Sequence, residues 1–135
     1  MNTVVRTSHL EMHSATELLP SRRVPGEVLL VRAGIPSPEL NRFLYTAVGG
    51  DYYWRDRLEW TWAQWLGWVD RPELETWVAH VAGTPAGYFE LEAQAGDSVE
   101  LAYVGLLPGF AGQGLGGYLV SQAVHRAWSM GPAVR

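Results

Sequence analysis

The chain has 135 residues, of which 47% are hydrophobic and 12% aromatic, and its formal net charge is −4. This length predicts one domain, and seven tryptophans with few charged residues argue against intrinsic disorder. Cysteine and lysine are both absent, which excludes disulfides, thiolate metal sites and cysteine nucleophiles, together with any mechanism that needs a Schiff-base or phosphate-loop lysine.

The N-terminal part of the chain carries little periodic pattern. Residues 1–26 are weakly patterned, so we treat them as an N-terminal extension that precedes a domain over residues 27–135. The segment at 27–33 is short and rich in β-branched and apolar residues. It therefore predicts the first strand of the domain.

Two helices are predicted next. Ser37 is a favourable N-cap ahead of apolar residues at helical spacing, and the Gly49-Gly50 pair supplies a stop signal. The aromatic-dense segment at 51–72 carries a second apolar stripe at helical spacing, which Pro72 ends.

Three further strands are expected to form an antiparallel meander. The segments 75–83 and 86–94 flank Thr84-Pro85, which predicts a tight turn. A turn over residues 96–98 then leads to a strand over residues 99–107. Gly105 lies inside this last strand, where a glycine often marks a bulge or a close approach of another backbone.

A glycine-rich loop and a helix complete the predicted order. Five glycines occur in residues 109–118, and apolar residues at four-residue spacing predict a helix over residues 115–130. The order β-α-α-β-β-β-α predicts an α+β (α/β) fold with a mixed, mainly antiparallel sheet flanked by helices. Because such a helix normally returns the chain to a parallel strand, we expect the domain to be incomplete at its C-terminus. The open sheet edge would then allow a homodimer.

The glycine loop has the pattern of an anion-binding site. Backbone N–H groups at a helix start are unpaired and carry partial positive charge, and glycines allow a phosphate to approach them. Gly112, Gly114 and Gly117 match G-x-G-x-x-G, but the antiparallel strands and the lack of a later acidic residue argue against dinucleotide binding. A nucleoside-triphosphate loop is excluded because it requires lysine.

Residues 102–131 resemble the acetyl-CoA-binding motif of the GCN5-related N-acetyltransferases, the GNAT superfamily. The shared features are an apolar strand, a proline, an aromatic residue and a glycine loop that opens a helix. They match at Leu106, Pro108, Phe110, Gly114, Gly116, Leu119, Ala127 and Gly131. The upstream order of elements also matches the first half of that fold. Ala111 departs from the pattern, because the family usually has arginine or glutamine there.

The resemblance implies direct transfer of acetyl from acetyl-CoA to an amine on a small molecule or a peptide, without a metal. The implied CoA contacts are Gly105, Leu106, Ala111, Gly112, Gln113, Gly114, Leu115 and Gly116. The loop would hold the pyrophosphate, and the edge of the last strand would hold the pantetheine beside a bulge at Gly105. The alternative is a truncated GNAT-like module that binds CoA or a partner without catalytic activity.

The candidate catalytic residues lie on the last two strands of the meander. Glu100 is the candidate general base, because strand alternation places it on one face with Val104, among apolar neighbours that raise a carboxyl pKa. Tyr103, expected on the opposite face, is the candidate proton donor to the CoA thiolate. Glu90 and Glu92 are weaker candidates for the base.

Candidate acceptor-binding residues follow the first helix. The resemblance implies that the first two helices cover the acceptor, so Tyr52, Trp54 and Arg55 are expected to contact it. Arg55 and Arg57 would suit an acceptor that carries a carboxylate. The other interpretation of this segment is that its tryptophans pack the helix layer.

Metal, nucleic-acid and membrane partners are not expected. His9 and His13 would form a metal-binding pair only on a helix, and their segment has no helical pattern. No basic patch suggests nucleic-acid binding. No secretory signal is apparent, and no apolar run approaches the roughly 20 residues of a membrane helix. We therefore expect a cytoplasmic protein.

Overall fold

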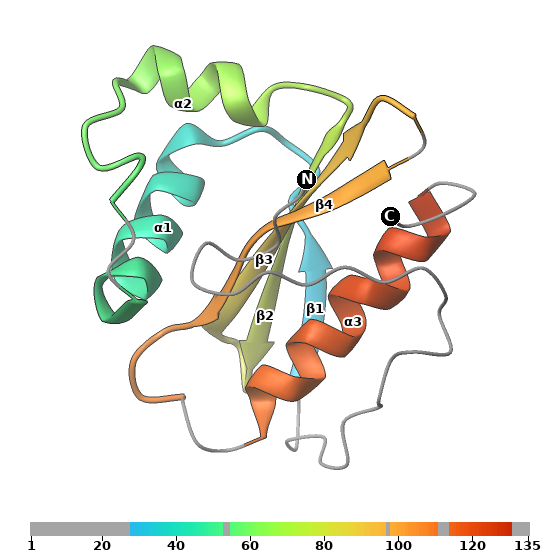
Figure 1. The fold of residues 1–135 in the computed structure, drawn as a ribbon. Helices are drawn as coiled ribbons and strands as arrows, with labels where there is room; N and C mark the ends of the chain where they lie inside the picture. The colour runs from blue at the N-terminus through green and yellow to red at the C-terminus, as the bar shows by residue number, and fades with distance from the viewer. Residues whose placement is uncertain (1–27, 53–54, 97, 111–113, 131–135) are drawn as a thin grey trace.

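The computed structural model describes residues 28–52, 55–96, 98–110 and 114–130 (Figure 1). The predicted element order is confirmed. The elements are β1 (Val28–Arg32), α1 (Pro38–Tyr52), α2 (Trp62–Val69), β2 (Leu74–Val81), β3 (Thr84–Gln94), β4 (Ser98–Leu106) and α3 (Leu115–Met130). No helix among the described residues is long and apolar enough to cross a membrane.

The four strands form one antiparallel sheet in the order β1-β2-β3-β4. In Figure 1, α1 and α2 lie on one side of this sheet and α3 lies on the other. Each face therefore buries its own set of apolar side chains. The predicted α+β fold is confirmed, with helices flanking a sheet whose described strand pairs are all antiparallel.

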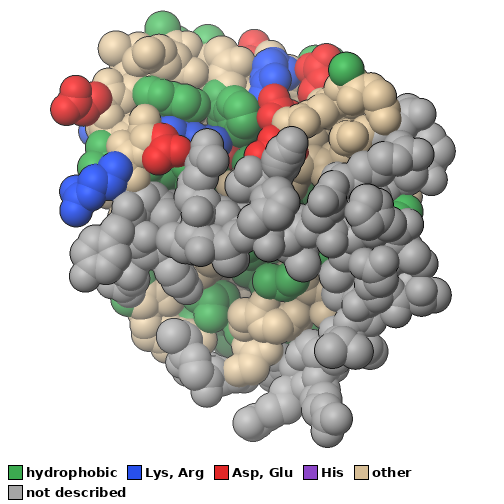
Figure 2. Space-filling model, in the orientation of Figure 1, with side chains coloured by type: hydrophobic (Ala, Val, Ile, Leu, Met, Phe, Trp, Pro, Cys, Tyr) green, Lys and Arg blue, Asp and Glu red, His purple; other side chains and the backbone are tan. Residues whose placement is uncertain are grey.

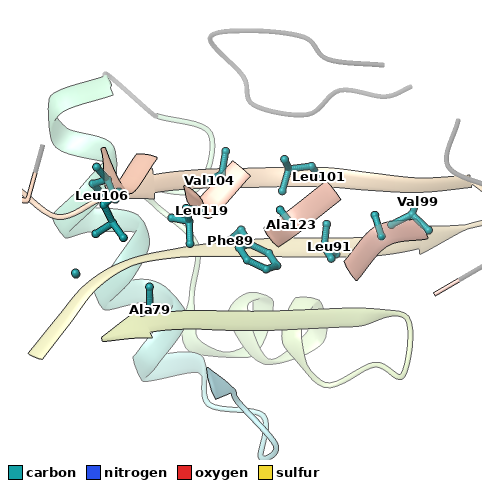
Figure 3. Packing of buried hydrophobic residues seen from close by; sticks show 12 residues of the cluster. Ala79, Phe89, Leu91, Val99, Leu101, Val104, Leu106, Leu119 and Ala123 are labelled. Carbon is teal, nitrogen blue, oxygen red and sulfur yellow. The ribbon is translucent and has the colours of Figure 1, made fainter. Parts of the chain in front are cut away.

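The α3-side core lies between α3 and the sheet. Figure 3 shows its side chains from the strands directed toward α3. It includes Ala79, Phe89, Leu91, Val99, Leu101, Val104, Leu106, Leu119 and Ala123. The α1/α2-side core lies on the opposite face. It consists of Leu44, Tyr45, Val48, Trp65, Val78, Tyr88, Ala102 and Tyr103.

A β-bulge interrupts β4 and changes which side chains share a face. Glu90 pairs with Tyr103 and Leu91 pairs with Leu101, so Ala102 has no partner on β3. An unpaired extra residue shifts the alternation of the bulged strand by one position. As a result, Val99, Leu101 and Val104 all face α3, whereas Ala102 and Tyr103 both face α1 and α2.

The bulge overturns three expectations about β4. It lies at Ala102 and not at Gly105, which pairs in register with Tyr88. Glu100, between Val99 and Leu101, lies on the α1/α2 face and does not share a face with Val104. Tyr103 is on the same face as Glu100, because the extra residue between them reverses the expected alternation.

Two element boundaries also differ from the prediction. Helix α1 continues through Gly49-Gly50 to Tyr52, so these glycines do not stop it. The turn between β2 and β3 is Ala82-Gly83, whose φ angles are 51° and 83°, and not Thr84-Pro85. Positive φ at both central residues is the geometry of a type I′ hairpin turn.

Helix α3 is tied to β2 by a buried carboxylate. Glu75 accepts hydrogen bonds from Arg126 Nε and Nη2 at 2.8 and 2.7 Å. Burial alone raises the pKa of Glu75, but hydrogen bonds from Arg126 and Trp77 and the charge of Arg32 hold that pKa below its ordinary value. The carboxylate therefore stays charged and fixes the inner face of α3 on the sheet.

Gly87 allows β3, β4 and α3 to approach closely. A Cβ at this position would lie 2.7 Å from the carbonyl oxygen of Gly105 and 2.9 Å from Leu106 Cδ2. Gly87→Ala is therefore expected to lower the free energy of unfolding by about 1–3 kcal/mol, because backbone cannot move aside as a side chain does. Urea denaturation measures the loss.

Gly67→Ala in α2 is the matched control for that substitution. Nothing lies within 4 Å of a Cβ at Gly67, and alanine favours a helix over glycine by about 1 kcal/mol. The control is expected to be as stable as the original chain or slightly more so. Equal stability of the two alanine variants would show that β3 and β4 do not approach as closely as described.

Candidate active site

A fully buried carboxylate lies between the sheet and helices α1 and α2. Glu90, on β3, is 0% exposed. It accepts hydrogen bonds from Asn41 Nδ2 at 2.8 Å, from Arg57 Nη1 at 3.0 Å and from Trp68 Nε1 at 2.9 Å. A buried carboxylate needs such donors to offset its lost hydration. Glu90 thus joins β3 to both helices and to the segment between them.

Arg57 is the charged partner of Glu90, and it is also buried. It lies in the connection between α1 and α2 and is 4% exposed. Its guanidinium carbon lies 4.4 to 5.7 Å from the centres of five aromatic rings, those of Tyr45, Trp60, Trp65, Trp68 and Tyr103. The electron-rich ring faces favour a cation. We name Glu90, Arg57 and these rings the Arg57 cluster.

A chain of polar contacts runs from Arg57 to the bulge of β4. The backbone N–H of Arg57 donates to Tyr45 Oη at 3.1 Å, and the side chains of Tyr45 and Tyr103 are hydrogen-bonded to each other. Tyr103 Oη then donates to Asp56 Oδ2 at 3.0 Å. Burial is the main cause that raises the pKa of Tyr45, so its phenol stays protonated at neutral pH.

Glu92 and Glu100 lie on the same face of the sheet as Glu90 and nearer the β3–β4 turn. Glu92 and Glu100 are partners across the two strands. Glu92 pairs with Arg71 Nη1 at 2.8 Å, and Glu100 is half-buried and accepts a hydrogen bond from Gln94. The structure therefore brings Glu100, Tyr103 and Glu90 to one face, which the strand pattern alone did not predict.

The outer edge of β4 leads toward the start of α3. In the described part of the chain, no strand pairs with this edge. Gly105 and Leu106 are buried at the end of β4, and Gly114, directly before Leu115 at the start of α3, is exposed with a φ of 81°. Of the predicted loop contacts, Ala111, Gly112 and Gln113 lie outside the described residues.

The stretch of sequence that forms this junction has no charged side chain of its own. Residues 101–125 contain no aspartate, glutamate, lysine or arginine. In Figure 2, charged side chains of described residues appear in the upper half of the view, near α2 and the β3–β4 turn, and none appears in the lower half. Among residues 101–125, only backbone N–H groups and the helix dipole could therefore hold an anion at the start of α3.

The predicted acceptor residues are only partly within the described chain. Arg55 is exposed at the start of the α1–α2 connection. Tyr52 ends α1, and its side chain lies outside the described residues, as do Trp54, His9 and His13. Arg57 was expected to face an acceptor, and this is wrong, because Glu90 and the aromatic rings enclose it.

Sequence reasoning missed Asp56 and Asn41. Asp56 lies beside Tyr103 only because the connection folds back onto β4. Asn41 follows the N-cap of α1 and reaches both Glu90 and Thr76. The only sequence signal for Asn41 was that a polar residue occupies a helical position that faces the core. Within the described residues, no group of three or more histidine, aspartate or glutamate side chains is placed to hold a metal.

Comparisons with known proteins agree with this geometry. Residues 39–132 match the acetyltransferase (GNAT) family. No curated protein matches the sequence. Solved structures with the same fold include paiA N-acetyltransferase from Thermoplasma acidophilum in complex with coenzyme A. That structure has a TM-score of 0.60 and 16% identity, over 77% of this chain and 74% of that one.

Two further solved structures share the fold. A GCN5-related N-acetyltransferase from Kribbella flavida has a TM-score of 0.60 and 23% identity, over 87% of this chain and 42% of that one. An aminoglycoside acetyltransferase from an uncultured soil metagenomic sample, in complex with trehalose, has a TM-score of 0.61 and 9% identity, over 76% and 71%. The family match covers more than half of the sequence, and the chain therefore belongs to the GNAT acetyltransferase family.

Proposed function

We propose that this protein transfers an acetyl group from acetyl-CoA to an amine. The observation that carries the proposal is the junction of β4 and α3. A bulged strand whose outer edge has no partner among the described residues leads to a glycine in left-handed conformation at a helix N-terminus. This arrangement suits an elongated anionic substrate. The main chain at the edge of β4 would bind one part of the substrate, and the unpaired N–H groups at the start of α3 would bind its anionic end.

In this proposal, CoA lies along the outer edge of β4. Its pyrophosphate is held by N–H groups of the loop at Ala111, Gly112, Gln113 and Gly114 and by the first residues of α3, Leu115 and Gly116. The pantetheine follows the main chain at Gly105 and Leu106. The bulge at Ala102 leaves a residue unpaired with β3, and its backbone N–H is the proposed donor to the thioester carbonyl.

The proposed chemistry is direct attack. The neutral amine nitrogen bonds to the acetyl carbonyl carbon, the C–S bond breaks, and the CoA thiolate leaves. Glu100, half-buried on the α1/α2 face, is the proposed base that takes the proton from the attacking amine. Tyr103, beside the bulge, is the proposed donor to the thiolate, for which its hydroxyl would turn away from Asp56 Oδ2. Tyr52, Trp54 and Arg55 are proposed to line the acceptor.

Calorimetric titration with acetyl-CoA, paired with a thermal-shift measurement, tests the proposal. We expect saturable binding and a rise in melting temperature, because a ligand of the folded state stabilises it by mass action. Release of CoA thiol that depends on an added primary amine then tests transfer. Binding without transfer to any amine would favour a CoA-binding module. No binding at millimolar acetyl-CoA would exclude both acetyl transfer and CoA binding for this chain and would leave the interaction module.

A further inference from the structure

Asp56 directly precedes Arg57 in the sequence, and Arg57 is held in place through both its side chain and its backbone. The side chain of Arg57 is fixed by Glu90 at 3.0 and 3.3 Å and by the surrounding rings, and its backbone N–H is fixed by Tyr45. The cost of removing two charges from water is offset only when the geometry of the ion pair is well matched. Such a buried pair gives the α1–α2 connection a defined position over the sheet.

Asp56 is exposed, yet its carboxylate has a defined place. Its Oδ2 accepts a hydrogen bond from Tyr103 Oη at 3.0 Å, and Tyr103 directly follows the bulge at Ala102. The exposed carboxylate is therefore held at the tip of the Tyr103 side chain, on the α1/α2 side of the bulge. Arg57, its neighbour in sequence, directs its positive charge to Glu90.

We propose that Asp56 binds the positively charged amine of the acceptor and that the Arg57 cluster positions Asp56 for this task. The inference rests on the proposed function, because the bulge marks the acetyl group only if CoA lies along β4. Aliphatic amines are ammonium ions at neutral pH, and a carboxylate is their natural partner. A carboxylate that is already positioned loses little conformational freedom when it binds.

The test compares Asp56→Asn with Glu59→Gln. Both substitutions remove one negative charge from the α1–α2 connection, and Glu59 is exposed as well. Asparagine keeps an oxygen that can accept the hydrogen bond from Tyr103. The acceptor probes are 2-phenylethylamine, which is a cation at neutral pH, and aniline, which is neutral. Rates of CoA release are measured against the concentration of each amine, and calorimetry gives the affinity for acetyl-CoA.

Asp56→Asn is expected to raise KM for 2-phenylethylamine about tenfold, because the neutral amide cannot form a charge-assisted hydrogen bond with the ammonium group. KM for aniline and the affinity for acetyl-CoA should stay unchanged, and Glu59→Gln should leave all three values unchanged. Equal effects of the two variants on 2-phenylethylamine would overturn the proposal. An equal loss with aniline would also overturn it, because a structural role affects both amines.

A binding measurement separates this inference from the proposed function. Tryptophan fluorescence follows saturation of the chain with 2-phenylethylammonium alone, because Trp60 and Trp68 lie around the neighbouring Arg57. If Asp56→Asn weakens this binding about tenfold, the result supports the role of Asp56 even if acetyl-CoA does not bind. If acetyl-CoA binds but the original chain neither binds nor acetylates this amine, Asp56 does not recognise the ammonium group.

Discussion

Replacing Glu90 with alanine is expected to lower the free energy of unfolding by about 3–5 kcal/mol, because it leaves a buried charge without its partner. The guanidinium of Arg57 is enclosed by aromatic rings and has its ion pair with Glu90. Asn41 and Trp68 lose their shared acceptor at the same time. A loss of this size approaches the whole stability of a small domain. Urea denaturation, followed by tryptophan fluorescence, measures it.

Glu92→Ala provides the matched control on the same strand and the same face. Glu92 also pairs with an arginine, Arg71, but both side chains of that pair are partly exposed, at 17% and 30%. Ion pairs open to solvent contribute about 0–1 kcal/mol, so the control should lose little stability. Similar losses for the two variants would mean that Glu90 and Arg57 are hydrated and that the cluster does not fix the α1–α2 connection.

The element order was predictable because each element carries a local signal. Helix α3 has apolar residues at helical spacing, and its predicted range of 115–130 is confirmed. The strands carry runs of β-branched and apolar residues between turn signals. The end of α1 was not predictable in this way. Helix α1 continues through Gly49-Gly50, and Val48 is fully buried in the α1/α2-side core, so packing outweighs the local cost of glycine.

The bulge and the Arg57 cluster could not be predicted, because their causes lie far apart in the sequence. Nothing in residues 99–106 distinguishes a regular strand from one that has an extra residue at Ala102, since both faces of β4 are apolar there. Glu90 and Glu92 are two residues apart on β3, so the strand alternation places both side chains on the same face and does not distinguish them. Only the partners of Glu90, which lie 33 and 49 residues away in Arg57 and Asn41, make it a buried residue.

Gly114→Asp is expected to weaken acetyl-CoA binding by about 100-fold or more, because like charges about 4 Å apart near a protein surface repel by roughly 4 kcal/mol. The added carboxylate would face the pyrophosphate at the start of α3, where no arginine or lysine in residues 101–125 could offset it. The φ of Gly114 is 81°, a conformation that asparagine and aspartate adopt more readily than other residues. Calorimetric titration with acetyl-CoA measures the loss.

Gly114→Asn and Gly116→Ala are the controls that assign this loss to charge. Asparagine has nearly the shape of aspartate and the same tolerance of left-handed backbone, so it should weaken binding much less. A Cβ at Gly116 would point to Leu106 Cδ1 at 3.7 Å, an ordinary contact, so alanine there should leave acetyl-CoA affinity unchanged. If aspartate and asparagine weaken binding equally, the obstruction is steric. If neither weakens it, the pyrophosphate of acetyl-CoA binds elsewhere and the junction of β4 and α3 loses its proposed role.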